Sequence, residues 1–308
     1  MCPQVSVNVG VTVSLAISGP QDTVRAGIGT LINIENLRGS VGNDYLTGDN
    51  NFFGNVLEGG AGDDTLDGGG GSNDTVSYEH ATGGVTVDMV SETADGNASV
   101  GHDTISNFEF VRGSAYADIL TGSDSSVLEG GAGSDQLIGN VIGNDASIVA
   151  SYQHATAGVT VSLLNPGSNT GEAEGDTFVF VSSVQGQHFN LLGSQFNDTL
   201  IGDNNNNLLN GWGTRDNGSD TLTGNGGADT FGFSGGHVTI TDFNHLQNDK
   251  IDLSFLNFGT GISQTELEFL ITNAAPGAQT LDFGNEQTMT VNVTVSSLQL
   301  GDFLGLHA

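Results

Sequence analysis

The sequence has little of what would place it among disulfide-stabilised, membrane-spanning or signal-peptide-bearing proteins. Its 308 residues include four prolines and a single cysteine, Cys2, so no disulfide can form within the chain. No stretch approaches the ~18 apolar residues of a membrane helix. No basic segment followed by an apolar run stands near the N-terminus, so we expect no ordinary secretory signal there. If the protein is extracellular, something other than disulfides must stabilise it.

Positive charge is also scarce, with 5 Lys+Arg against 36 Asp+Glu and a formal net charge of -31. The basic residues are scattered and form no patch that would bind nucleic-acid phosphates: they are Arg25, Arg38, Arg112, Arg215 and Lys250. Such an acidic chain repels itself when compact, unless something neutralises it. A solubilising surface would explain the acid excess, but the acids recur at fixed places relative to glycines, which favours binding.

Glycine is abundant, at 48 residues, about twice the usual share of roughly 7%. Without the three-residue period of collagen, this indicates either recurrent tight turns or a disordered linker. Regular repeats favour turns. Gly10–Leu15, Gly84–Met89 and Gly158–Leu163 are similar and lie 74 residues apart, and Tyr78–Thr82 matches Tyr152–Thr156 at the same offset. The chain therefore holds about three copies of one module.

Within each module lies a shorter period near nine. Each copy has Gly first, Asp or Asn sixth and an apolar residue eighth; the clearest are Gly59–Asp67, Gly130–Ile138 and Gly224–Gly232, and the looser ones Gly39–Thr47, Gly113–Thr121, Gly193–Ile201 and Gly202–Asn210. The eighth positions are Leu46, Leu66, Leu120, Leu137, Leu200, Leu209 and Phe231. A Gly-rich turn followed by a short strand would put these apolar side chains into a shared interior, with stacked neighbours supplying the stability.

Stacking would also bring the sixth-position carboxylates into register, where like charges push the turns apart. A hard divalent cation with oxygen ligands at about 2.3–2.6 Å would turn that repulsion into cross-linking. Backbone carbonyls, which glycine turns leave open, can supply further ligands.

At these residues the sequence resembles the RTX (repeat-in-toxin) family, whose motif is Gly-Gly-x-Gly-x-Asp-apolar. The resemblance implies an all-β parallel β-roll, or β-solenoid, with Ca²⁺ between successive turns. The ligands it implies are Asp44, Asp64, Asp118, Asp135, Asp198, Asp220 and Asp229, the neutral Asn207, and the glycines Gly59, Gly60, Gly62, Gly130, Gly131, Gly133, Gly224 and Gly226. Asn55 would supply another neutral oxygen, Thr214–Asn217 interrupts the copy of Asp220, and the choice between Asn73 and Asp74, and between Asn144 and Asp145, stays open.

The segments between the repeat blocks alternate apolar and polar residues, which predicts strands at Val85–Met89, Thr104–Val111 and Val159–Leu163. They either add coils to the solenoid or form separate hairpins. The best helix candidate is Gln264–Thr272. We expect a partial first module (1–38), repeat blocks at 39–78, 113–152 and 193–233, intervening β segments at 79–112 and 153–192, and a C-terminal region at 234–308.

The C-terminal region resembles that of proteins exported by one-step (type I) secretion. Ala228–Phe233, Ile240–Phe243 and Asp249–Ser254 resemble the exit from the repeats, and Thr280–Gly284, Met289–Val295 and Ser297–Phe303 the targeting region. The resemblance thus covers roughly Gly10 to Phe303. A β-hairpin cap over the open end of the solenoid is an alternative explanation of the same residues.

Signals for an enzyme are weak. No His-Glu-x-x-His occurs, and the one Gly-x-Ser-x-Gly string, Gly232–Gly236, lacks a strand-to-helix context. His80 and His154 recur at one module position, where packing or hydrogen bonding beside Tyr78 and Tyr152 is favoured over a transition-metal role.

The leading hypothesis is a non-catalytic, extracellular calcium-binding protein that folds after type I export. The alternatives are a cell-surface adhesive or polymer-binding module, for which Asn204–Asn207 is the local hint, and the targeting end of a truncated enzyme.

Overall fold

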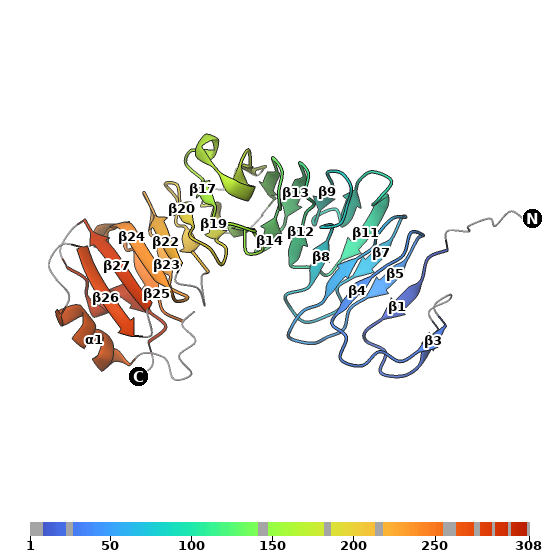
Figure 1. Cartoon of the computed structure of the whole chain (residues 1–308), viewed down its shortest axis with the longest axis horizontal. Coiled ribbons are helices and arrows are strands. Elements are labelled where there is room, and N and C mark those ends of the chain that lie inside the picture. Colours follow the sequence, from blue (N-terminus) through green and yellow to red (C-terminus); the bar gives the residue numbers. More distant parts are fainter. Residues whose placement is uncertain are drawn as a thin grey trace, which may run out of the picture. The chain divides into compact units, whose positions relative to one another are not determined.

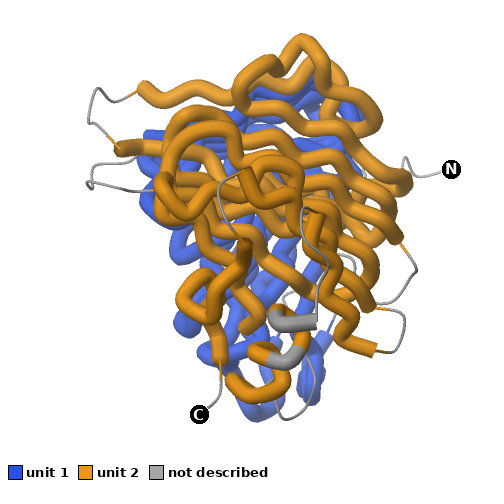
Figure 2. Tube along the Cα trace, turned by 90° about the vertical axis from the view of Figure 1, so that its left-hand side faces the viewer, with its two compact units in different colours: residues 1–140 blue, residues 141–308 orange. Residues whose placement is uncertain are grey.

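The computed structural model describes residues 9–22, 27–140, 147–181, 186–212, 218–254, 263–273, 278–284, 287–294 and 297–306. The chain divides into two compact units, residues 1–140 and 141–308 (Figure 2), and each is described by itself. Asn144, Asp145 and the insertion Thr214–Asn217 lie outside the described residues.

The first unit consists of short strands that alternate along the chain between two sheets (Figure 1). One sheet holds, in spatial order, β1 (Thr12–Ser14), β5 (Tyr45–Thr47), β7 (Thr65–Asp67), β11 (His102–Ser106), β10 (Thr93–Asp95), β9 (Thr86–Asp88), β13 (Ile119–Gly122) and β15 (Gln136–Gly139). The other holds β4 (Asn36–Arg38), β6 (Val56–Glu58), β8 (Thr75–Ser77), β12 (Phe110–Arg112) and β14 (Val127–Glu129). A separate antiparallel pair joins β2 (Gln21–Asp22) and β3 (Ile28–Gly29).

Parallel pairing stacks equivalent residues of successive coils. Leu46 pairs with Leu66, and Leu66 pairs with Ile105, and all three side chains are buried. Because strand residues alternate in direction, the middle residue of each three-residue strand points inward. The seven apolar eighth positions predicted from the repeat are all buried, which confirms the shared interior and the β-solenoid.

The first intervening segment both extends the solenoid and interrupts its parallel order. β9, β10 and β11 form a meander inserted between β7 and β13, and β10 runs antiparallel to both of its neighbours. The strands predicted at Val85–Met89 and Thr104–Val111 correspond to β9 and to β11 with β12.

The second unit again has two sheets. One holds β16 (Ser147–Ser151), β19 (His188–Leu192), β21 (Leu208–Asn210), β23 (Thr230–Gly232), β25 (Lys250–Asp252) and β28 (Phe303–Leu304). The other holds β17 (Thr160–Ser162), β20 (Thr199–Ile201), β22 (Ser219–Thr223), β24 (His237–Phe243), β27 (Gln287–Val293) and β26 (Ala278–Gly284). Between β17 and β19 lie two 3-10 turns, η1 (Pro166–Ser168) and η2 (Gly171–Ala173), and β18 (Thr177–Phe180).

The segments predicted as the exit from the repeats add further strands to the two sheets of the second unit. β25 pairs in parallel with β23, and β28 with β25. The predicted helix forms as α1 (Gln264–Asn273), and the antiparallel hairpin of β26 and β27 ends the other sheet, as the cap interpretation expects. Two 3-10 turns, η3 (His245–Gln247) and η4 (Leu300–Asp302), lie in this part. Among the described residues, no helix has the length and apolar character needed to span a membrane.

Candidate metal sites

The sixth-position carboxylates lie in the interior and bind the backbone of the preceding coil. The N–H of Asp44 donates to Oδ1 of Asp64 at 2.7 Å, and the N–H of Asp64 donates to Oδ1 of Asp103 at 2.9 Å. All three aspartates are at most 2% exposed. Each carboxylate therefore accepts a hydrogen bond from a buried N–H group that would otherwise have no acceptor. We call a series of these hydrogen bonds through successive coils a carboxylate ladder.

The same contact recurs through both units. Oδ1 of an acidic residue accepts from the N–H one coil earlier in the pairs Asp118–Val85, Asp135–Asp118, Asp198–Val159, Asp220–Asp198, Asp74–Asn55, Asp229–Asn207 and Asp249–Asp229. Of the pair left open by the sequence, Asp74 is the residue in the ladder, while Asn73 takes a positive φ of 76° in the turn. Asp103 and Asp249 belong to ladders without belonging to any predicted repeat copy.

The contacts of Asn55 and Asn207 explain why a neutral side chain stands at each of these two positions. The Nδ2 group of Asn55 donates to the carbonyl oxygen of Glu35 at 3.0 Å, and that of Asn207 donates to the carbonyl of Phe189 at 2.8 Å. At these places the preceding coil presents an acceptor instead of a donor, so an amide fits and a carboxylate would be repelled.

The glycines of the clearest copies have distinct tasks. A Cβ at Gly59 would overlap Oδ2 of Asp64, so the first glycine is needed for close approach of the carboxylate. Gly60 and Gly62 take φ of +98° and +132°, which side chains rarely adopt. Gly130, Gly131 and Gly133 repeat this pattern around Asp135. In the third copy Gly224 approaches Asp229, but the positive φ values belong to Asn225 and Gly227 and not to Gly226.

The residue in the second position separates copies with serine there from copies with glycine or asparagine there; the copy that begins at Gly202 has Asp203 and belongs to neither kind. In the serine copies, the N–H of Ser40, Ser114 or Ser194 donates to Oδ2 of its aspartate, and the serine hydroxyl donates to the same carboxylate. In the glycine and asparagine copies the second position holds no serine, and Oδ2 of Asp64 and Oδ2 of Asp229 are buried without a hydrogen-bond partner. An unpartnered buried carboxylate oxygen is costly, so these two oxygens fit a cation as their partner.

Burial disfavours the charged form of these groups. It raises the pKa of Asp64 to about 6, of Asp103 and Asp220 to about 7, and of Asp229 to about 8, against the lowering effect of the backbone hydrogen bonds. Burial also raises the pKa of Asp118 and Asp198, where hydrogen bonds from the serines act in the opposite direction. A divalent cation would offset the penalty where it is largest.

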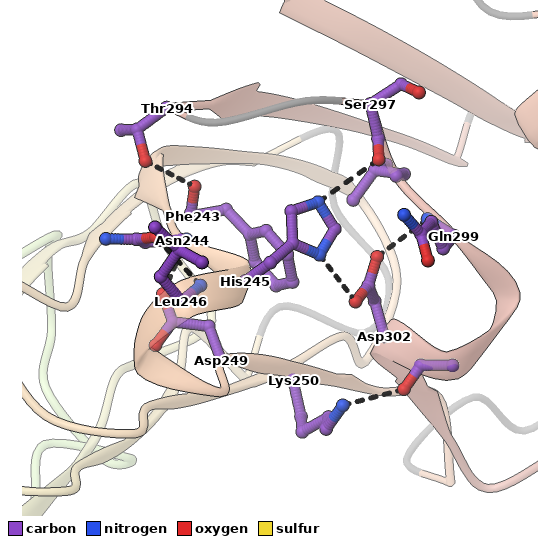
Figure 3. Close-up of polar contacts among 12 residues, drawn as sticks. Phe243, Asn244, His245, Leu246, Asp249, Lys250, Thr294, Ser297, Gln299 and Asp302 are labelled. Atoms are coloured by element: carbon purple, nitrogen blue, oxygen red, sulfur yellow. Dashed lines mark hydrogen bonds and ion pairs between the residues drawn. The ribbon is translucent and has the colours of Figure 1, made fainter.

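A polar network ties the last ladder to the C-terminal segment (Figure 3). Asp249 accepts from the N–H of Asp229 on Oδ1 and from the N–H of Asn244 on Oδ2. Next to it, Nδ1 of His245 contacts Oδ1 of Asp302 at 2.8 Å and Nε2 contacts the carbonyl oxygen of Ser297 at 3.1 Å. The segment that follows α1 is thereby held against the final coil.

His80 and Ser234, which the sequence offered as candidate functional residues, make hydrogen bonds to neighbouring side chains. Tyr78 is buried and its hydroxyl donates to Oδ2 of Asp103, while the ring of His80 turns to Glu58 with an Nδ1 to Oε2 distance of 2.9 Å. The hydrogen bond expected as one of the two roles of His80 is thus made with Glu58. Ser234 is 9% exposed and donates to Oδ1 of Asn210, an arrangement unlike that of an exposed nucleophile.

Five segments of the chain match a family model described as the RTX calcium-binding nonapeptide repeat (4 copies): residues 33–52, 49–76, 112–141, 190–217 and 216–240. All seven sixth-position aspartates predicted as ligands lie inside these segments, and repeats of this kind bind calcium. No curated protein matches the chain.

Proposed function

This chain belongs, through its calcium-binding nonapeptide repeats, to the RTX family, and from that premise we propose that it is an extracellular protein that folds when calcium fills its turns. The observation that carries the proposal is the pair of buried, unpartnered carboxylate oxygens, Oδ2 of Asp64 and Oδ2 of Asp229. Both stand in turns that combine a close first glycine with positive φ in the second and fourth positions.

We propose that the copies with glycine or asparagine in the second position (Gly60, Gly131 and Asn225) hold the ion. Asp64, Asp135 and Asp229 would supply carboxylate oxygens, and the Gly60, Gly62, Gly131 and Gly133 turns would supply carbonyl oxygens. Calcium prefers six to eight oxygen ligands and tolerates irregular geometry, which suits carboxylates and backbone carbonyls. In the serine copies, Asp44, Asp118 and Asp198 already accept several hydrogen bonds, so these aspartates would contribute less to ion binding.

Folding would follow export. Cytosolic calcium is too scarce to fill weak sites, and a chain with a net charge of -31 stays expanded and can pass a type I channel, with the C-terminal region as its address. Outside the cell, about millimolar calcium would fill sites of the 10⁻⁴–10⁻³ M class, and the binding free energy becomes folding free energy.

The described residues support a non-catalytic role. The Gly-x-Ser-x-Gly serine donates to Asn210, and the buried aspartates accept backbone hydrogen bonds within the ladders. The proposed partners are calcium and the type I secretion machinery.

A calcium titration of the metal-free chain tests the proposal. We expect the far-ultraviolet circular dichroism to gain β signal cooperatively at about 0.1–1 mM calcium, and a parallel calorimetric titration to count the ions bound. Magnesium at equal concentration should not produce the transition, because it demands octahedral geometry. A chelated sample that already shows full β signal and a cooperative melt would overturn the proposal.

A further inference from the structure

Ion pairs line one end of the second sheet of the first unit. Arg38 at the end of β4 pairs in register with Glu58 at the end of β6, and Arg112 of β12 pairs with Glu129 of β14. Arg38 and Arg112, two of the five basic residues in the chain, thus lie in one row of strand ends. Ser77 of β8, which pairs with Arg112, belongs to the same row.

The turn after β8 adds two more side chains to this row. The N–H of Ala81 donates to the carbonyl of Tyr78 at 2.9 Å, and the ring of Tyr78 is buried. This anchored turn carries Glu79 and His80 back toward the strand ends.

The arginines hold one oxygen of each glutamate and leave the other facing the imidazole. Nε of Arg38 lies 3.2 Å from Oε1 of Glu58, and Nη1 of Arg112 lies 2.7 Å from Oε2 of Glu79. Nδ1 of His80 lies 2.9 Å from Oε2 of Glu58 and 3.6 Å from Oε1 of Glu79. One atom of each of these three residues lies within 4.8 Å of the others.

We propose that Glu58, Glu79 and His80 form a binding site for a transition-metal ion of the zinc class, separate from the calcium turns. An imidazole nitrogen with two carboxylate oxygens is a donor set that zinc takes at about 2.0–2.2 Å, whereas calcium takes oxygen ligands.

The surroundings fit such an ion. Arg38 and Arg112 fix the orientation of the two glutamates, as the neighbours of metal ligands do. The side chains of His80 and Glu79 are 49% and 43% exposed, so an ion and water ligands can reach them, while that of Glu58 is 12% exposed and rigidly placed.

The repeated module supplies a natural control. His154 stands 74 residues after His80, but Gln153 takes the place of Glu79, so the carboxylate next to the histidine is absent there. Glu79→Gln therefore gives the first copy the Gln-His pair of the second, and His154→Ala is the matched control for His80→Ala.

Zinc titration of the full chain in about 10 mM calcium, a concentration that keeps the calcium sites filled, tests the site. Calorimetry should detect one zinc ion whose affinity falls at least about tenfold in His80→Ala and Glu79→Gln and does not change in His154→Ala. Calcium-induced circular dichroism of each variant should match that of the parent chain, which separates this result from the proposed function.

An unchanged zinc isotherm in His80→Ala, or an equal loss in His154→Ala, would overturn the proposal. If His80→Ala does not fold, nitrogen NMR of the imidazoles in the parent chain decides. One equivalent of zinc should shift Nδ1 of His80, and a spectrum in which that resonance stays in place refutes the site.

Discussion

The main-chain N–H of Asp44 donates a 2.7 Å hydrogen bond to Oδ1 of Asp64, its counterpart 20 residues further along the chain. The aspartate of the repeat therefore has a structural role that does not depend on an ion. One of its oxygens satisfies the backbone of the preceding coil, and the other points at its own first glycine. Under the proposed function, calcium and the fold would share one carboxylate, which would couple ion binding to coil stacking.

Asparagine substitutions should distinguish the two kinds of copy. Asp64→Asn removes a buried charge whose Oδ2 has no partner, so the metal-free chain at pH 8 should gain on the order of 1 kcal/mol of unfolding free energy, a figure discounted for solvent screening. The same change should weaken calcium binding. The residual β signal in chelator, measured by circular dichroism, and calcium calorimetry report the two effects.

Asp44→Asn is the matched control. Both oxygens of Asp44 accept N–H donors, from Val11 and from Ser40, so the amide NH₂ would face a donor and destabilise the metal-free chain by about 1–3 kcal/mol. If Asp64→Asn and Asp44→Asn change the unfolding free energy of the metal-free chain in the same direction, the division into serine and glycine copies is contradicted.

The sequence predicted the interior of this fold well because burial follows a strict period. The eighth positions, such as Leu66 and Phe231, are buried as expected, since one apolar residue per turn leaves no other way to form a core. The predicted helix at Gln264–Thr272 also forms.

Contacts between coils were harder to predict. Asp103 enters a ladder from the meander strand β11, outside any repeat copy, and its position depends on pairing between β11 and β7, 39 residues apart. The sequence shows that some copies begin with Gly-Ser, as at Ser40, and others with Gly-Gly. The effect of this difference on the aspartate follows only from the hydrogen bond that Ser40 donates to Asp44.

Gly59→Ala should disrupt the turn without touching any charge. The new Cβ would overlap Oδ2 of Asp64 and push the carboxylate out of place, at a cost of about 1–3 kcal/mol in unfolding free energy and with weaker calcium binding. Gly301→Ala is the control, because nothing lies within 4 Å of its Cβ position. In Gly59→Ala/Asp64→Ala the cost of the first change should largely vanish, and strictly additive costs would count against the overlap.

Tyr78→Phe should destabilise the calcium-loaded protein by about 1–3 kcal/mol, because it leaves Oδ2 of the buried Asp103 without its hydroxyl donor. Tyr152→Phe removes the equivalent 2.8 Å contact with Asp176 and should cost a similar amount. Tyr116, which is 49% exposed, provides the control, since Tyr116→Phe removes no buried hydrogen bond. Thermal unfolding of the three variants measures the effect, and equal melting temperatures for Tyr78→Phe and Tyr116→Phe would contradict it.

The metal-free fold should be most stable in acid and lose stability as the pH rises. The carboxyls of Asp64, Asp103, Asp220 and Asp229 have pKa values of about 6, 7, 7 and 8 in the fold, against about 3.9 in an unfolded chain. Between pH 4 and 8 the folded state therefore binds more protons than the unfolded state, so the unfolding free energy falls with increasing pH. Far-ultraviolet circular dichroism in chelator should therefore show more residual β signal at pH 5 than at pH 8. Calcium competes with these protons, so its affinity should rise over the same range and the saturated protein should depend less on pH. Metal-free stability that instead increases from pH 5 to pH 8 would mean that the buried carboxylates are charged and satisfied without an ion.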